Sequence, residues 1–329
     1  MASHISGIHH ITAIAGDPQR NVDFYVGALG LRMVKRTVNF DDPRTYHLYY
    51  GDESGSPGSI LTFFPWPQAP RGRLGTGQAS ATAYSIPAES VGFWLDRLKR
   101  LGVAADGPVD RLGDQVISFS DPDGLPLELA APEAPDPRLP WREGSVPAEH
   151  AIRGFHGVTL LEAQFDATAG LLTEALGFRA SGEAGERRRF VTGGGGSGSI
   201  VDLVQAPGSR RGVVAVGTVH HVAWRARDDA EQEAWREKIA ALGHDVTPVV
   251  DRKYFRSIYF REPGGVLFEI ATDAPGFAID EGPDRLGTSL VLPSWLGPRR
   301  AELEAALPPI HLPEAPAGGA ARGAGKTPA

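Results

Sequence analysis

Two histidine pairs stand in similar surroundings at distant points of the chain, and both could supply metal ligands. The first lies in the segment 7–12 (GIHHIT) and the second in the segment 218–223 (TVHHVA). Each pair is set among β-branched residues, which predicts that it opens a strand. A third segment, 259–269 (YFREPGGVLFE), places Glu269 in an otherwise apolar strand, where a buried carboxylate needs a partner or a metal ion.

We interpret His10, His221 and Glu269 as the ligands of one metal ion. Two imidazoles and one carboxylate leave adjacent coordination positions free, as in non-haem Fe(II) oxygenases. A bidentate substrate and dioxygen could both bind at those positions. The same donors suit Mn(II), so they do not distinguish it from Fe(II). A single histidine pair is more often a packed or surface feature than a metal site, and a single strand glutamate usually lies on a solvated face. Two histidine pairs at equivalent places in a repeat, together with a glutamate in mid-strand, favour the metal interpretation.

The alternation of side chains along a strand predicts on which face the residues next to these ligands lie. His9 and His10 are expected on opposite faces of their strand, as are His220 and His221, and only a bulge would bring both members of a pair to one cavity. His47 is expected on a strand surface and receives no role.

The elements that must position these residues repeat four times along the chain. Four amphipathic segments end in a leucine followed by a glycine, the residue expected to cap a helix in the left-handed conformation. These stops are Leu29-Gly30, Leu101-Gly102, Leu176-Gly177 and Leu242-Gly243. Strand-like segments rich in β-branched and aromatic residues follow each helix, so every unit is predicted to be βαβββ.

The four units divide the chain into two predicted domains. Residues 1–133 hold units one and two, 134–152 form a linker, and 153–273 hold units three and four. A C-terminal extension with a short helix is expected over 274–312, and a disordered tail over 313–329.

Only one metal site can be assembled from these units. Gly157 stands where unit one has His10, and the first strand of unit two lacks a histidine. Glu128 matches Glu269 but is expected to be a structural remnant. Units one and four must therefore lie side by side.

Composition narrows the chemistry further. The 329 residues include 33 basic and 40 acidic residues and no cysteine, which excludes disulfides, thiolate nucleophiles and iron–sulfur clusters. A net charge of −7 offers no electrostatic footprint for nucleic acid or for anionic membranes. The N-terminus lacks the features of a signal peptide, so a cytoplasmic protein is expected.

Taken together, the chain resembles the vicinal-oxygen-chelate superfamily, which includes glyoxalase I, bleomycin-binding proteins and extradiol dioxygenases. The segments 7–42, 219–227 and 251–269, with the ending LVLP at 290–293, resemble more specifically the ring-cleaving dioxygenases of the chlorohydroquinone 1,2-dioxygenase type. This resemblance extends to about residue 309. It implies an α+β fold in which four βαβββ units form two vicinal-oxygen-chelate domains with curved mixed sheets.

The resemblance also implies an activity. Fe(II) on His10, His221 and Glu269 would support cleavage by O₂ of a small aromatic diol, preferably a hydroquinone and otherwise a catechol. Further functional residues would be His9, Thr12, His220, Arg252 and Tyr259. His220 and Tyr259 would donate hydrogen bonds or shuttle a proton. Arg252 would balance anionic charge, unless it forms a surface ion pair with its neighbour Asp251.

Three other classes stay open, one of them a structural or regulatory protein with an incidental histidine cluster. A glyoxalase-like isomerase or transferase has the same fold but usually a second carboxylate at the metal, and a non-catalytic binding protein generally lacks a complete ligand set. The preferred ring substituents and the oligomeric state, including a homo-oligomer, are left open by the sequence.

Overall fold

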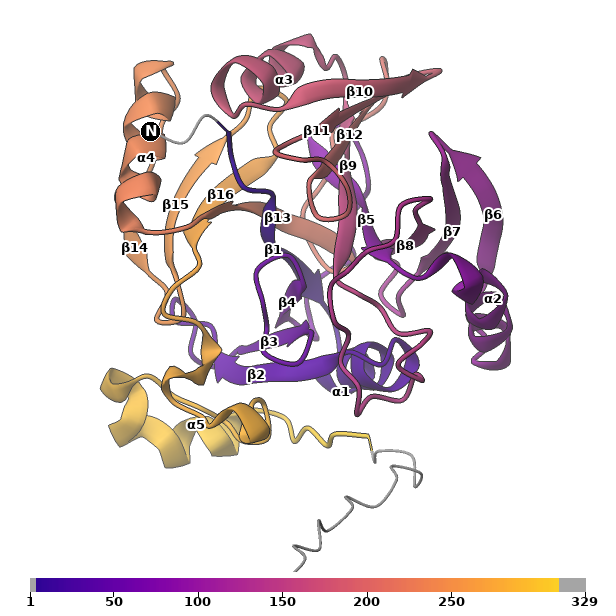
Figure 1. The fold of residues 1–329 in the computed structure, drawn as a ribbon. Coiled ribbons are helices and arrows are strands. Elements are labelled where there is room, and N and C mark those ends of the chain that lie inside the picture. The colour runs from indigo at the N-terminus through magenta and orange to yellow at the C-terminus, as the bar shows by residue number, and fades with distance from the viewer. Residues whose placement is uncertain (1–3, 314–329) are drawn as a thin grey trace, which may run out of the picture.

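Strands from all four repeats form two curved, mixed sheets of eight strands each in the computed structural model, which describes residues 4–313 (Figure 1). The first sheet has the order β14-β15-β16-β13-β1-β4-β3-β2. Its strands are β1 (Ile8–Ala15), β2 (Arg32–Val38), β3 (Tyr46–Gly51), β4 (Ile60–Pro65), β13 (Thr218–Ala226), β14 (Val250–Asp251), β15 (Arg256–Arg261) and β16 (Leu267–Thr272).

The second sheet has the order β10-β11-β12-β9-β5-β8-β7-β6. Its strands are β5 (Gln78–Ser85), β6 (Ala105–Arg111), β7 (Asp114–Ser120), β8 (Pro126–Ala131), β9 (Phe155–Glu162), β10 (Arg179–Ala184), β11 (Arg187–Val191) and β12 (Ile200–Gln205). The α+β class with two curved mixed sheets is thus as predicted.

Each sheet combines one unit from each half of the chain. Antiparallel pairing of β1 with β13 joins units one and four, and antiparallel pairing of β5 with β9 joins units two and three. The predicted neighbourhood of units one and four is therefore confirmed. The boundaries 1–133, 134–152 and 153–273 describe the order of units along the chain, and the sheets form across those boundaries.

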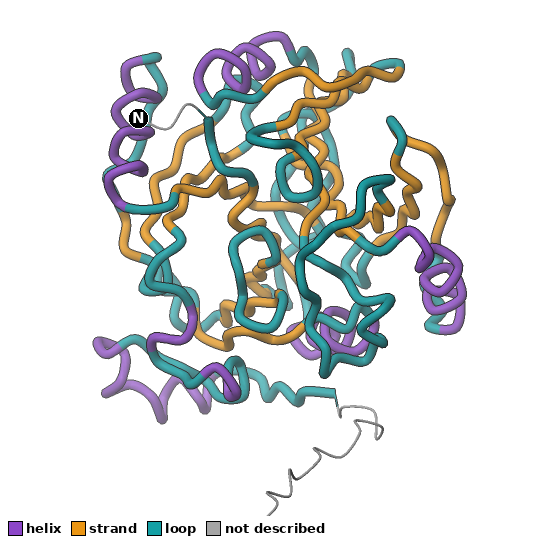
Figure 2. Tube along the Cα trace, viewed as in Figure 1, coloured by secondary structure: helices purple, strands orange, loops and turns teal. Residues whose placement is uncertain are grey.

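Helices lie outside the strands, at the margins of the molecule (Figure 2). They are α1 (Pro18–Val22) with the π-helical turn η1 (Asp23–Ala28), the 3₁₀ turn η2 (Ala88–Ser90) with α2 (Val91–Arg100), α3 (Asp166–Gly170) with the π-helical turn η3 (Leu171–Ala175), and α4 (Asp229–Ala241). The glycine after each of the four predicted leucine stops has φ between 71° and 88°, as a left-handed cap requires.

Strand alternation separates the core from the concave side of the first sheet. On β4, Phe63 packs against Tyr25 of η1 with ring centroids 4.6 Å apart. The neighbouring Thr62 points the other way and meets the hydroxyl of Thr12 on β1. One face of the sheet thus holds the helices, and the opposite face is free for a site.

The C-terminal extension crosses the outer end of the first sheet beside β2 (Figure 1). It contains η4 (Phe277–Ile279), η5 (Pro283–Arg285), η6 (Ser294–Arg299) and α5 (Arg300–Ala306). The Tyr46 hydroxyl donates to the Pro308 carbonyl at 2.9 Å, which ties the extension to β3. Apart from Pro313, the predicted tail over 313–329 lies outside the described residues. Across residues 4–313, no helix is long and apolar enough to span a membrane.

Candidate metal centre

Three neighbouring strands bring His10, His221 and Glu269 together on the concave side of the first sheet. Ala223 of β13 pairs with His10 of β1 on one side and with Glu269 of β16 on the other. His221 lies two residues before Ala223 and therefore faces the same side. All three ligand candidates are buried, and their side chains meet although the first and the last are 259 positions apart in the sequence.

The spacing of their polar atoms fits a metal ion. Glu269 Oε2 lies 2.9 Å from His221 Nε2 and 3.4 Å from His10 Nε2, and the two Nε2 atoms are 3.4 Å apart. Ligand atoms about 2.1 Å from one cation and at right angles are about 3 Å apart. Glu269 Oε2 is fully buried and accepts no hydrogen bond. Among the described residues, this is the one group of three or more metal-ligating side chains that converges.

Hydrogen bonds assign the tautomer of His10. His9 Nε2 lies 3.1 Å from the Thr272 carbonyl, which only accepts, so this nitrogen carries the proton. Burial, with a smaller effect of the nearby His10, lowers the pKa of His9 to about 3, so the ring is neutral and its Nδ1 accepts. His10 Nδ1, 2.9 Å away, must then donate. With its proton on Nδ1, His10 can offer the Nε2 lone pair, on the side of Glu269 and His221, to a metal ion.

The same relation holds in the second pair. His220 Nδ1 lies 2.7 Å from His221 Nδ1. Burial lowers the pKa of His220 to about 3, with a further lowering by His221. If His221 Nε2 faces the ligand cluster unprotonated, its Nδ1 donates to His220, and His220 carries its own proton on Nε2.

Two bulges explain how neighbouring histidines come into contact. In the pairing of β1 with β13, the register shifts between Ile8 and His10, so His9 has no partner. It shifts again where Thr12 pairs with His221 and Ala13 with Val219, which leaves His220 unpaired. The expectation of opposite faces is therefore wrong for both pairs, because each bulge re-aims one side chain.

A cavity of about 280 Å³ opens beside the three ligand candidates. Aromatic and aliphatic side chains form its walls, namely Phe40, Phe64, Trp66, Phe255 and Leu267. Polar side chains complete the lining, including Thr12, Asn39, Asp41, His47, Tyr49, His220, Arg252 and Tyr259. Of the five further residues predicted for the site, four line this cavity, whereas His9 lies behind His10.

Two of the predicted residues contact each other on the cavity wall. Arg252 Nε donates to the Tyr259 hydroxyl at 3.1 Å. Burial, with a further contribution from Glu269, raises the pKa of Tyr259, so the phenol keeps its proton. Arg252 also pairs with Asp41, at 3.1 Å between Nη1 and Oδ2. The alternative of an ion pair with Asp251 is wrong, because that carboxylate accepts from the Lys253 amide instead.

His47 is a residue of this cavity that sequence reasoning placed on a strand surface. Its Nε2 lies 2.8 Å from Thr62 Oγ1 and its Nδ1 2.8 Å from the Tyr49 hydroxyl. Thr62 in turn meets Thr12 at 3.0 Å, so a hydrogen-bonded chain runs along the cavity wall. The position of His47 and Tyr49 two residues apart on one strand was the available signal, since such residues share a face.

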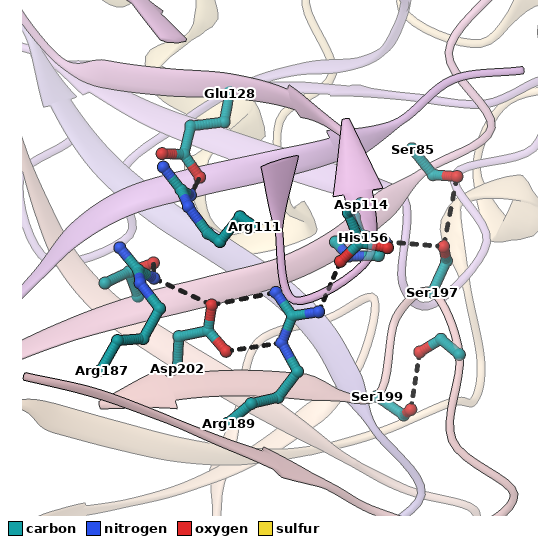
Figure 3. A network of polar contacts seen from close by, with 12 residues as sticks. Ser85, Arg111, Asp114, Glu128, His156, Arg187, Arg189, Ser197, Ser199 and Asp202 are labelled. Carbon is teal, nitrogen blue, oxygen red and sulfur yellow. Dashed lines mark hydrogen bonds and ion pairs between the residues drawn. The ribbon is translucent and has the colours of Figure 1, made fainter. Parts of the chain in front are cut away.

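The second sheet carries a polar network where the first has the ligand cluster (Figure 3). Ala83 pairs with Glu128 and Gly157, as Ala223 pairs with Glu269 and His10, and Ala81 falls where His221 would be. Glu128 accepts from Arg111 Nη1 at 2.6 Å. Further along, Asp202 accepts from Arg187 and Arg189. Glu128 is thus engaged by an arginine, in keeping with a structural role.

The family model of the Glyoxalase/Bleomycin resistance protein/Dioxygenase superfamily matches residues 7–129 and 154–270. A Bacillus subtilis (strain 168) protein named "Putative ring-cleaving dioxygenase MhqO" is 48% identical to this chain, and the alignment covers 95% of this chain and 99% of that protein. The "Chlorohydroquinone/hydroquinone 1,2-dioxygenase" of Sphingobium indicum is 36% identical, over 88% and 92% respectively. A crystal structure described as a "putative dioxygenase" from B. subtilis superimposes with a TM-score of 0.91 at 48% identity, over 95% of this chain and 100% of that one.

Proposed function

Because this chain belongs to the Glyoxalase/Bleomycin resistance protein/Dioxygenase superfamily, we propose that it is an Fe(II)-dependent ring-cleaving dioxygenase. Its substrates would be O₂ and a dihydroxylated aromatic ring, a hydroquinone in preference to a catechol, and Mn(II) is the alternative metal. The observation that carries this proposal is the convergence of His10, His221 and Glu269, whose ligand atoms lie within 4.8 Å of one another. The names of the relatives from B. subtilis and S. indicum support the same reaction class.

The cavity suits a substrate with a single ring. About 280 Å³ is enough for one substituted benzene, and the apolar walls supply contacts for its faces and edge. Phe64 and Trp66 stack at 20° with centroids 6.1 Å apart, which makes a flat wall on one side. A ring held there would direct a hydroxyl group towards the three ligands.

The protein's own residues would hold protons near the reacting oxygen atoms. When bound, a divalent metal supplies Lewis acidity that favours ionisation of the phenol, and a template that brings diol and dioxygen together. Tyr259 keeps its proton and, because it accepts from Arg252, is free to donate into the cavity. His220 would donate from Nε2, and Thr12 from its hydroxyl. His9 acts from behind by orienting His10.

The remaining assignments rest on the sequence. We place the enzyme in the cytoplasm, with the aromatic diol and O₂ as its partners and neither nucleic acid nor membrane. A homo-oligomer is compatible with these assignments.

Anaerobic purification followed by metal analysis and oxygen uptake tests the proposal. About one Fe(II) per chain, the number that a single facial triad binds, with uptake that depends on hydroquinone is the expected result. Uptake with catechol alone would support ring cleavage but contradict the para-diol preference. Metal binding without uptake on either diol would favour an isomerase instead.

Variants of the ligands sharpen this test. Replacing His221 or Glu269 by alanine should abolish metal retention and turnover together, because either change removes one of three donors. Replacing Glu128 by alanine is the matched control, since it removes the equivalent glutamate of the second sheet and should leave the metal content unchanged. Full activity in either ligand variant would contradict the assignment.

A further inference from the structure

The cavity rim carries an ion pair between the two halves of the chain. Asp41, in the loop between β2 and β3, accepts from Arg252, which follows β14. The Asp41 side chain is 76% exposed and that of Arg252 is 27% exposed, so the pair lies where the cavity meets solvent. A substituent on a bound ring that points away from the metal ligands would come close to it.

The charges of the cavity balance without any contribution from a ring substituent. Within the described chain, its lining holds one guanidinium group, Arg252, and two carboxylates, Asp41 and Glu269. A divalent ion together with Glu269 leaves one positive charge, which a single phenolate oxygen neutralises. Arg252 and Asp41 neutralise each other. An anionic ring substituent would therefore bring a charge that nothing in the cavity offsets.

The segment that carries Asp41 is held from outside the cavity. The adjoining Phe40 packs edge-on against Trp295 of the C-terminal extension, with ring centroids 5.5 Å apart. In the same loop, Arg44 forms an ion pair with Glu302 of α5, with 3.5 Å between Arg44 Nη2 and Glu302 Oε1. The C-terminal extension thus holds the loop between β2 and β3 on the side away from the metal ligands. These contacts help to keep Asp41 beside Arg252.

We propose that Asp41 is a specificity-determining residue that neutralises Arg252 and so disfavours diols with an anionic ring substituent. The preferred substrates are then aromatic diols whose other substituents are uncharged. This inference rests on the proposed function for its choice of ligand but concerns binding, which can be measured without turnover.

Calorimetric titration of the Fe(II)-loaded protein without oxygen tests this inference. The ligands are 2,5-dihydroxybenzoate and the uncharged 2,5-dihydroxybenzamide, which have nearly the same shape. Wild-type protein should bind the amide more tightly. Asp41→Asn should lower the Kd of the benzoate by about fivefold, the upper range for an exposed ion pair, and leave that of the amide unchanged.

Two further variants separate this ion pair from a general charge effect. Asp251→Asn removes the same charge beside Arg252 without breaking a contact to its guanidinium group, and should change neither Kd. In an Arg252→Gln background, Asp41→Asn should no longer favour the benzoate. An unchanged ratio of the two Kd values in Asp41→Asn, or an equal change in Asp251→Asn, would overturn the inference. Absence of oxygen uptake with hydroquinone would instead contradict the proposed function and leave this binding result intact.

Discussion

At the scale of single residues, each histidine pair determines which ring nitrogen of the proposed ligand carries the proton. A histidine ligand needs its proton on the nitrogen that faces away from the metal, and a hydrogen-bond acceptor is required there. His9 provides that acceptor for His10, and the Thr272 carbonyl fixes the tautomer of His9 in turn. The second pair has the same Nδ1–Nδ1 contact. Each proposed histidine ligand is therefore oriented by the residue that precedes it.

The carboxylate ligand is oriented by a serine, and this contact gives a first prediction. Ser257 donates to Glu269 Oε1, leaving Oε2 to face the histidines. Ser257→Ala should weaken metal affinity about tenfold, the lower range for loss of such a partner. Competition with a chelator would measure it. Ser118→Ala is the matched control, since Ser118 donates to Glu128 in the second sheet. Equal affinity in wild type and Ser257→Ala would contradict the prediction.

At the scale of elements, the same repeat forms a cluster of candidate metal ligands in the first sheet and a network of arginine–carboxylate ion pairs in the second. Both keep a glutamate at the same register, but only the first has histidines at the two ligand positions, which Gly157 and Ala81 occupy in the second. In the second, a side chain at Gly157 would meet the Ile200 carbonyl at 2.9 Å, so that position is closed by packing. Arginines then satisfy the carboxylates that a metal would otherwise hold.

A second prediction concerns the end of β9, where Glu162 is 1% exposed. Burial, with a further contribution from Glu262, raises its pKa to about 8. The folded chain keeps this carboxyl neutral while the unfolded chain ionises it, so stability falls as the pH rises from about 4.5 to 8. Glu162→Gln stays neutral and should raise the Tm by about 3 °C at pH 8, with little change at pH 5.

Thermal unfolding of wild type and Glu162→Gln between pH 5 and pH 8 would measure this effect. Glu174→Gln, on the exposed side of η3, is the control and should change the Tm little at either pH. A Tm difference that does not depend on pH would show that Glu162 is ionised in the folded protein.

A third prediction concerns the C-terminal extension. Trp295 is 60% exposed, yet its ring contacts Phe40 of the cavity lining. Trp295→Ala should raise the KM for the diol about fivefold, the value of one aromatic pair, and leave the metal content unchanged. Steady-state oxygen uptake would measure it, with Ile279→Ala as a control that removes another exposed side chain of the extension. Loss of metal in Trp295→Ala would contradict a role confined to the rim.

At the scale of the whole molecule, neither half of the chain can complete a sheet. Residues 1–133 contain β1 and β5, whose partners β13 and β9 lie in the second half. His10 likewise lies in a different half from His221 and Glu269. The proposed metal site and the junctions of both sheets therefore depend on the same association.

This arrangement predicts the behaviour of two fragments, 1–133 and 153–329. Each fragment alone should bind no metal, because each lacks part of the triad and exposes two unpaired strands. Expressed together, they should associate and recover about one metal per pair. Size-exclusion chromatography with metal analysis would measure both properties. Metal bound by the second fragment alone would show that His10 is dispensable.

Local features of this protein could be predicted from the sequence alone. The glycine after each helix, the alternation of β4 and the donor types of His10, His221 and Glu269 depend on neighbouring residues and on side-chain chemistry. The absence of histidine at Gly157 and in the first strand of unit two left one way to assemble a triad. The same absence predicts that units one and four lie side by side, which the pairing of β1 with β13 confirms.

Tertiary structure alone decided the features that depend on pairing between distant strands. The bulges at His9 and His220 exist because β1 and β13 pair out of simple register, and alternation within one strand cannot reveal an extra residue. His47 enters the cavity, and Asp41 reaches Arg252, only because the first sheet curves and the extension holds its rim. Contacts between residues that are distant in sequence depend on how whole sheets pack, and no local pattern encodes that packing.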